Sequence, residues 1–160
     1  MIMSDLLSRA SERFTTCCIK EPRYRVAWLV GLPQRSRKTL LARQLCELQG
    51  WQYLDYTLTS GYFDALVDTI DSYQPPQLVT AIRGWCEACD APVLVLDEID
   101  AVLATWDRNQ RRIWAALVAR LQYLPHGLII VSHFFNHSQL IEYLPDHDPR
   151  YCIDLSGDTL

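Results

Sequence analysis

Two short segments carry side chains that could bind a phosphate chain and a metal ion. The first is Lys38-Thr39, which follows an apolar run and a loop that opens at Gly31. A lysine at this place can reach the β- and γ-phosphates of a nucleotide, and the following hydroxyl can bind Mg²⁺. The second is Asp97-Glu98, which ends another apolar run. Asp97 is predicted to hold Mg²⁺, and Glu98 is predicted to polarise an attacking water as a general base.

The loop before Lys38 departs from the usual phosphate-binding pattern, the Walker A motif GxxxxGK[ST]. Leu32 and Arg37 occupy the two glycine positions, and Gly31 lies one residue early. The second glycine normally lets the backbone approach the phosphate without a side chain in the way. Arg37 must therefore turn its side chain aside, or else add positive charge to the site. We predict that Gly31, Arg37, Lys38 and Thr39 bind the nucleotide, and the irregular loop leaves hydrolysis open.

Apolar runs alternate with helical patterns along the chain, which is typical of a parallel α/β sheet. Strands are predicted over 25–30, 51–56, 92–96, 127–132 and 151–155. Helices are predicted over 4–19, 38–48, 62–72, 77–90, 108–124 and 138–143, with a short helix or loop over 99–104, and Pro75-Pro76 are expected to break the chain. Ligands bind such sheets at the carboxyl ends of the strands, where Asp97 and Glu98 would emerge. We predict one domain over residues 1–160, a doubly wound, mostly parallel, five-stranded P-loop NTPase sheet, with 1–22 as an N-terminal helix and linker.

The sequence Leu96-Asp97-Glu98-Ile99-Asp100 resembles the Walker B box of AAA+ and related initiator-type ATPases. The resemblance implies a polar sensor residue at the end of the following strand, with Ser132 as the first candidate and His133 as the second. It also implies that Arg150, just before the last predicted strand, reaches the γ-phosphate of a neighbouring subunit. AAA+ proteins continue into a helical lid, whereas this sequence ends after its fifth predicted strand, so we expect no lid domain.

A narrower resemblance concerns the chain's size, its Walker B end and the stretch from Tyr143 to Tyr151. These features are similar to the small P-loop subunit of bacteriophage-exclusion (BREX) defence systems. This resemblance implies a partner in a multi-protein, anti-phage complex that acts on or near DNA.

The net charge of −4 argues against a global basic field for nucleic acid. A local cluster of Arg108, Arg111, Arg112 and Arg120 on one predicted helix could still contact DNA phosphates. The alternative is a solvated helix face or pairing with acids of a neighbour. DNA contact through Arg108, Arg111 and Arg112 therefore stays open.

Compartment and metal content can be judged from the cysteines and histidines. The six cysteines lie in apolar segments, and no signal-peptide pattern precedes them. No apolar run reaches the roughly 20 residues of a membrane span, so a cytoplasmic location without a membrane partner is expected. Cys86-Glu-Ala-Cys89 lacks two further zinc ligands, and the pair His133 and His137 lacks a third. Helix packing is the favoured interpretation for the two cysteines, and a polar loop is the favoured interpretation for the two histidines.

Three hypotheses follow. The first is an ATP-binding, Mg²⁺-dependent subunit that hydrolyses ATP by in-line attack of water, with Arg150 acting in trans upon assembly. The second is an inactive pseudo-ATPase scaffold or adaptor, which the residues at positions 32 and 37 and the absent lid favour. The third is a DNA-engaging accessory subunit, supported by the arginine-rich helix. The intact Glu98 argues against the scaffold, because a scaffold needs no catalytic base.

Overall fold

The protein, seen in a computed structural model, is described over residues 3–31 and 35–157. Within these residues, five strands form one sheet in the order β2-β3-β4-β1-β5, and every neighbouring pair is parallel. The strands are β1 (Val26–Val30), β2 (Gln52–Asp55), β3 (Val93–Asp97), β4 (Gly127–Val131) and β5 (Cys152–Asp154). The predicted α/β class and the five-stranded parallel sheet are thereby confirmed. Leu32, predicted to replace a glycine of the phosphate loop, lies outside the described residues.

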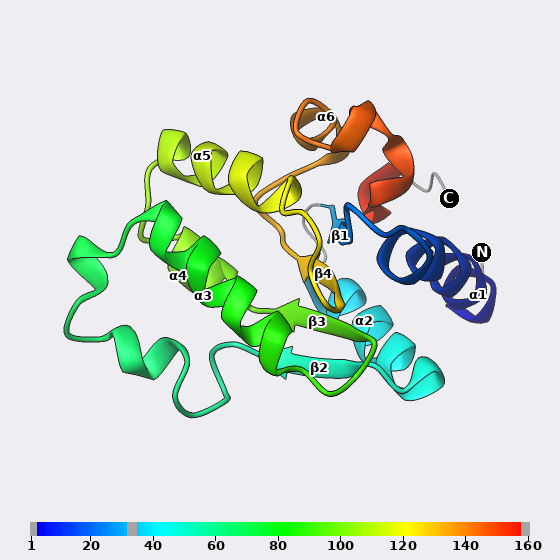
Figure 1. The fold of residues 1–160 in the computed structure, drawn as a ribbon, viewed down its shortest axis with the longest axis horizontal. Helices are drawn as coiled ribbons and strands as arrows, with labels where there is room; N and C mark the ends of the chain where they lie inside the picture. Colours follow the sequence, from blue (N-terminus) through cyan, green and yellow to red (C-terminus); the bar gives the residue numbers. More distant parts are fainter. Residues whose placement is uncertain (1–2, 32–34, 158–160) are drawn as a thin grey trace.

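Helices cover both faces of this sheet. They are α1 (Met3–Thr15), α2 (Arg35–Gln49), α3 (Pro75–Ala88), α4 (Asp100–Leu103), α5 (Arg108–Ala119) and α6 (His137–Leu140). The crossover from β1 to β2 runs across the sheet in the direction opposite to the steps from β2 to β3 and β4. Because parallel crossovers are right-handed, α2 lies on the other face from α3 and α5. In agreement, α1 contacts α2, and α3 packs beside α5 (Figure 1).

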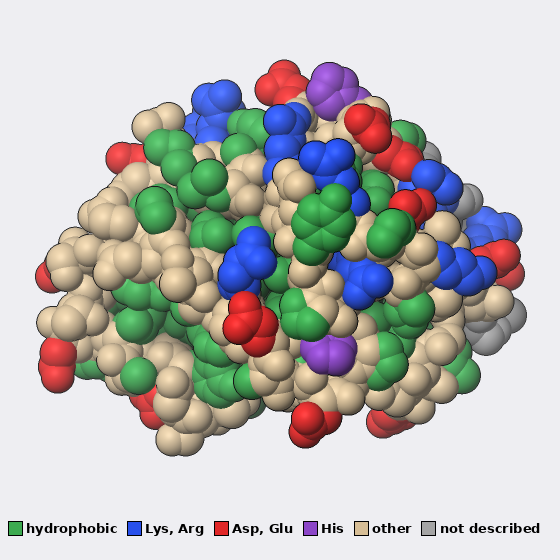
Figure 2. All heavy atoms as spheres, viewed as in Figure 1, with side chains coloured by type: hydrophobic (Ala, Val, Ile, Leu, Met, Phe, Trp, Pro, Cys, Tyr) green, Lys and Arg blue, Asp and Glu red, His purple; other side chains and the backbone are tan. Residues whose placement is uncertain are grey.

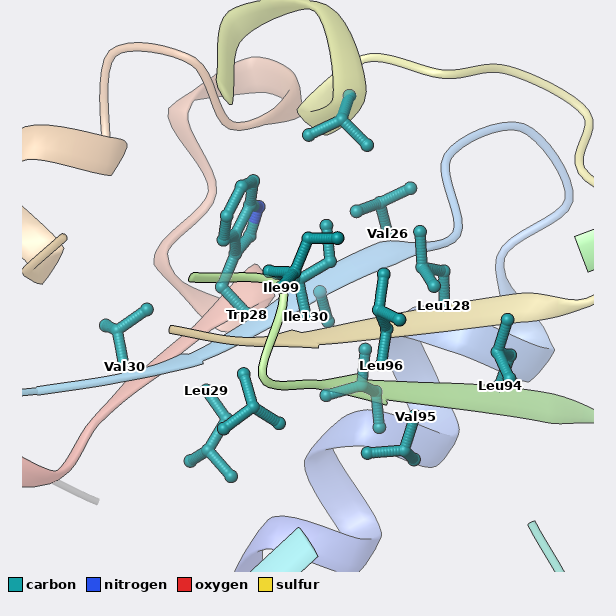
Figure 3. Close-up of a cluster of buried hydrophobic side chains, with 14 of the residues drawn as sticks. Val26, Trp28, Leu29, Val30, Leu94, Val95, Leu96, Ile99, Leu128 and Ile130 are labelled. Atoms are coloured by element: carbon teal, nitrogen blue, oxygen red, sulfur yellow. The ribbon is translucent and has the colours of Figure 1, made fainter. Parts of the chain in front are cut away.

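The three central strands supply the core. Every residue of β1, β3 and β4 is buried, as expected for parallel strands that are covered on both faces. Figure 3 shows Trp28 and Leu128 on one side of the strands, with Leu29 and Val95 on the other. Trp28 meets the Trp114 ring of α5 edge-on, at a centroid distance of 5.7 Å. This core fixes the strand ends that carry the polar residues described below.

Two predicted helices differ from the structure. The helix predicted over 62–72 is wrong: the segment forms two 3₁₀ turns, Phe63–Leu66 and Ile70–Ser72, in which no residue is buried. Without a buried face, packing does not stabilise a regular helix there. The helix predicted over 108–124 ends instead at Ala119. Beyond Ala119 the chain turns, and Gln122 forms an antiparallel β-bridge with Tyr24. The backbone groups at Gln122 are therefore paired with Tyr24 instead of continuing the helix.

The proline pair also acts differently from the prediction. Pro75 and Pro76 begin α3 rather than separating it from the preceding segment. Proline suits the first helical turn because its missing N–H would have no partner there in any case, and its fixed φ matches the helix. In the described part of the chain, no helix is both long and apolar enough to cross a membrane.

Candidate functional site

Three segments carrying predicted site residues meet at one edge of the sheet. Gly31 follows β1, Ser132 follows β4, and Asp97 ends β3. Since β4 lies between β1 and β3 and all three strands are parallel, their carboxyl ends lie side by side. Open α/β sheets bind ligands at this edge.

Asp97 is the centre of the hydrogen-bond network at this edge. Its Oδ2 accepts a hydrogen bond from Thr39 Oγ1 at 2.7 Å and another from the Tyr53 hydroxyl at 2.7 Å. Its Oδ1 accepts from the backbone N–H of Glu98 at 2.8 Å. Asp97 is only 4% exposed. The structure thus brings together Thr39 and Asp97, the two residues that the sequence predicts as metal ligands.

Tyr53 was missed at the sequence level. It lies on β2 opposite Val95 of β3, two residues before Asp55, which pairs in register with Asp97. Residues two apart on a strand share a face, so the tyrosine reaches the carboxylate diagonally. Burial, together with the bond to Asp97, raises the pKa of Tyr53, so the phenol stays protonated and donates. Only the register of β2 against β3 reveals this partner.

Lys38 and Arg37 lie in the first turn of α2. Lys38 is 2% exposed, and its ammonium group donates to the carbonyl oxygen of Gly31. Arg37 is half-buried in the helix, and its φ is not positive. A glycine-like backbone conformation is therefore not required at position 37. The lysine and the threonine that follow the loop both face the carboxyl edge of the sheet.

Gly31 has a conformational requirement of its own. Its φ is +127°, a region that side chains rarely adopt, and a Cβ atom there would lie 2.8 Å from the backbone nitrogen of Ser156. The glycine thus allows the end of β1 to approach the segment after β5. This role is structural and distinct from the predicted role in nucleotide binding.

Glu98 stands in a strained position. Its φ is +66°, in the left-handed region, which costs a residue other than glycine roughly 1 kcal/mol or more. Such strain clusters at functional sites, where the surrounding structure holds it in place. Glu98 is half-buried, between β3 and the start of α4. The backbone therefore turns sharply at the residue predicted as general base.

Ser132 pairs with a carboxylate that the sequence reasoning did not use. Its Oγ donates to Asp100 Oδ1 at 2.6 Å, and the backbone N–H of His133 donates to Asp100 Oδ2 at 3.0 Å. The imidazole Nδ1 of His133 lies 2.5 Å from the same oxygen. Ser132 and Asp100 are both buried. Both residues predicted as sensors therefore contact Asp100, the last residue of the segment that resembles a Walker B box, and this contact links the end of β4 to α4.

Arg150 lies away from the other predicted residues. It precedes β5, whose Cys152 pairs with Trp28, so it belongs to the amino edge of the sheet. Its guanidinium contacts Asp148 at 2.7 Å, and its side chain is 57% exposed. The hydrogen bond from Arg150 lowers the pKa of Asp148, so the pair stays ionised at neutral pH. Within one chain, Arg150 is not brought to the carboxyl edge.

The arginines of α5 and Arg120, the residue that follows this helix, have different surroundings. Arg108, Arg111 and Arg112 line a pocket of about 410 Å³ that residues 134–143 complete. Arg120 instead donates to the carbonyl oxygens of Glu142 and Tyr143, at 2.9 and 3.0 Å, and so anchors the chain after α6. Lys and Arg side chains gather over this part of the molecule in Figure 2, with acidic side chains beside them.

The donor set at Asp97 suits a hard cation. A threonine hydroxyl and a carboxylate offer only oxygen atoms, and Mg²⁺ bound with a nucleotide typically uses one or two such ligands together with phosphate oxygens. Among the described residues, no three His, Cys, Asp or Glu side chains gather to hold a metal without such help. All six cysteines are buried free thiols.

No protein-family model matches the chain, and no curated protein matches it significantly.

Proposed function

We propose that this chain is an ATP-binding subunit of the AAA+-like P-loop type, which holds ATP together with Mg²⁺ at the carboxyl edge of its sheet. The observation that carries the proposal is the hydrogen bond between Thr39 and Asp97, at 2.7 Å. It joins the residue after the phosphate-loop lysine to the carboxylate that ends the Walker B strand. These are the two protein groups that a nucleotide-bound Mg²⁺ requires.

Each residue has a role in this proposal. The ammonium group of Lys38, now on the Gly31 carbonyl, would bind the β- and γ-phosphates. Thr39 and Asp97 would hold Mg²⁺, which neutralises charge on the phosphate oxygens when bound. Tyr53 would fix the orientation of Asp97 through its 2.7 Å hydrogen bond. The N-terminus of α2 would add a favourable dipole for the phosphates.

Hydrolysis, in this proposal, depends on assembly. Glu98 would orient the attacking water, and Ser132 would report on the γ-phosphate through its contact with Asp100. Arg150 lies at the opposite edge of its own sheet, so it would serve the site of a neighbouring subunit. The proposed enzyme is thus a weak ATPase as a single chain and a better one as an oligomer.

The wider setting of the proposal comes from the sequence resemblance. It is a cytoplasmic multi-protein complex of the bacteriophage-exclusion (BREX) type, acting in antiviral defence. The free thiols of all six cysteines support a reducing compartment. Partner proteins would supply the surfaces on which the subunit assembles.

A nucleotide-binding scaffold without turnover is the second candidate. It is favoured by the pairing of Ser132 with Asp100 and of Arg150 with Asp148, because each polar group already has a partner within the chain. Such a protein would use nucleotide to stabilise an interface rather than to drive chemistry. Turnover by the assembled protein separates the two candidates.

The deciding experiment titrates fluorescently labelled ATP into the wild type and into Lys38→Ala, with Mg²⁺ and with EDTA. Lys20→Gln is the control, since Lys20 is exposed and also loses one positive charge. We expect Mg²⁺-dependent binding by the wild type and by Lys20→Gln, and its loss in Lys38→Ala. Absence of wild-type binding at millimolar ATP, or equal binding by Lys38→Ala, would overturn the proposal.

A further inference from the structure

A pocket beside α5 is lined by none of the residues that contact Asp97, although the backbone N–H of Phe134 in its wall donates to the Ser132 hydroxyl at 3.1 Å. It has a volume of about 410 Å³, within the usual range of roughly 300–1,000 Å³ for small-ligand pockets. One wall is the first two turns of α5, with Arg108, Arg111 and Arg112, and the other includes Phe134 and Tyr143. The pocket therefore concentrates guanidinium groups in a concave place.

Two of these arginines are held in position by their surroundings. The Arg111 guanidinium lies over the Phe134 ring, 4.6 Å from its centroid, and its Nη1 donates to the Trp106 carbonyl oxygen at 2.6 Å. The Nε of Arg112 donates to the Tyr143 hydroxyl at 3.2 Å, which leaves the two Nη groups for a ligand. Fixing a side chain beforehand lowers the entropy that binding would otherwise cost.

The charge of the pocket is unbalanced. Among the residues that the structure describes, Glu142 is the one carboxylate that lines it, against three arginines. Within the described residues, none of these arginines forms a salt bridge, although the chain as a whole carries a net charge of −4. A single carboxylate ligand would leave part of this positive charge unmatched. A phosphate monoester carries about −1.5 to −2 at pH 7, and a nucleic-acid strand carries one charge per nucleotide.

We propose that this pocket is a second phosphate-binding site, separate from the ATP site, in which Arg108, Arg111 and Arg112 bind a phosphate group. The planar fork of an arginine matches two phosphate oxygens at once, which a lysine cannot do. The phosphate comes either from a nucleic-acid strand that crosses the pocket or from a small phosphorylated molecule. The proposal does not depend on ATP binding at the carboxyl edge.

The experiment uses two probes on a Lys38→Ala background, so that the carboxyl-edge site does not contribute. A fluorescein-labelled oligonucleotide of twelve thymidines is followed by anisotropy at several salt concentrations, and inorganic pyrophosphate is followed by calorimetry. The test variant is Arg108→Gln/Arg112→Gln, because both side chains are exposed and their loss leaves the core intact. Lys20→Gln controls for loss of charge elsewhere. Circular dichroism confirms that each variant is folded.

We expect the two substitutions to lower the affinity for the probe that binds by about tenfold or more. For the oligonucleotide, the slope of log affinity against log salt concentration should become less steep by about one unit per lost contact. Tyr143→Phe, which frees Arg112, should weaken binding by a smaller factor, and Lys20→Gln should leave it within about twofold. Tight binding of the oligonucleotide with weak binding of pyrophosphate identifies a nucleic-acid strand. Comparable binding of pyrophosphate identifies a small phosphorylated molecule.

Three results would overturn the proposal. One is that neither probe binds at low salt. Another is that both probes bind equally well to the wild-type pocket and to the double variant. The third is that a poly-aspartate peptide of equal charge displaces the oligonucleotide as well as unlabelled oligonucleotide does, since the pocket would then accept acidic protein surfaces rather than phosphate in particular.

Discussion

Thr39 and Asp97 are 58 residues apart in the sequence, and their side chains are 2.7 Å apart in the fold. The bond connects the fifth residue of α2 to the last residue of β3. Since α2 and β3 are also in contact, the sheet and the helix hold both groups in place. The proposed metal ligands are thus already adjacent before any ligand binds, and little rearrangement is needed to bring them to a cation.

Asp97→Asn should abolish the effect of Mg²⁺ on ATP binding. The amide keeps the size of the side chain but loses the negative charge that a hard cation requires. We expect ATP affinity in Mg²⁺ to fall by about tenfold or more, while affinity in EDTA changes little. Labelled-ATP titrations in both buffers measure this.

The matched control for that substitution is Asp55→Asn. Asp55 pairs in register with Asp97 on the neighbouring strand, and its carboxylate accepts from the backbone N–H of Thr57 and Leu58. An asparagine oxygen can also accept these bonds, so the fold should be retained. If Asp55→Asn and Asp97→Asn behaved alike, the assignment of Asp97 as the metal ligand would be wrong.

Tyr53→Phe should loosen the metal site without emptying it. The hydroxyl donates to the same Asp97 oxygen that Thr39 contacts, so its loss leaves the carboxylate less well oriented. Removing such an outer partner typically costs about 10–100-fold in metal affinity. We expect the Mg²⁺ concentration for half-maximal ATP binding to rise by about tenfold.

Tyr62→Phe is the control for Tyr53→Phe. Tyr62 packs against Tyr56 and Trp85, and in the described part of the chain its hydroxyl has no hydrogen-bond partner. The Mg²⁺ dependence should not change in this variant. A Tyr53→Phe protein with the wild-type Mg²⁺ dependence would show that the hydroxyl does not position Asp97.

The sequence predicts the two proposed metal ligands of this site better than it predicts the side chains that contact them. Thr39 and Asp97 could be paired in advance because each follows a buried strand, and parallel strands bring their carboxyl ends to one edge. Tyr53 and Asp100 could not, because their contacts depend on the register between strands and on the turn at Glu98, which local patterns do not encode. The predicted helix over 62–72 failed for a related reason, since this segment packs only partly against the core and has no fully buried face to hold a regular helix.

Gly31→Ala should destabilise the protein by about 2–3 kcal/mol, since the added methyl group meets the Ser156 backbone at a positive φ. Gly84→Ala on α3 is the opposite case: no atom lies within 4 Å of its added Cβ, and alanine favours helix by about 0.5–1 kcal/mol. Urea unfolding compares the two. Similar shifts in the two variants would contradict the close approach of β1 to the segment after β5.

Alkaline pH should destabilise the fold through its buried thiols. Burial raises the pKa of Cys17 to about 11 and the pKa values of Cys46 and Cys86 to about 12. Unfolded cysteines lose their protons from about pH 8.5, while the folded state keeps them, so the unfolded state binds fewer protons above that pH. The contribution of these buried thiols to the free energy of unfolding is therefore full below about pH 8.5, and it is lost as the pH rises through about 11.

Urea midpoints at pH 7.5 and pH 10, under reducing conditions, test this pH dependence. The midpoint should be lower at pH 10. Cys46→Ala removes one of the titrating groups, so its midpoint should fall less between the two pH values. Equal midpoints for the wild type at both pH values would contradict the burial of these thiols.

Arg150 should act on a neighbouring subunit, because its own chain holds it at the amino edge of the sheet, beside Asp148. Arg150→Ala should bind ATP normally, since no described contact links it to Lys38, Thr39 or Asp97. Its turnover in the assembled protein should fall by about 10³-fold or more, the usual contribution of an arginine that stabilises the transferring phosphoryl group. Glu98→Gln should likewise bind ATP without turning it over.

Mixing these two inactive proteins distinguishes action in trans from action within one chain. In a mixed ring, an Arg150→Ala subunit keeps Glu98, and an adjacent Glu98→Gln subunit can supply Arg150 to it. Random mixing in equal amounts places such a pair at about a quarter of the head-to-tail interfaces, so about a quarter of the wild-type turnover should return. A mixture that stays inactive, while wild-type subunits mixed with either variant remain active, would show that Arg150 does not complete a neighbour's site.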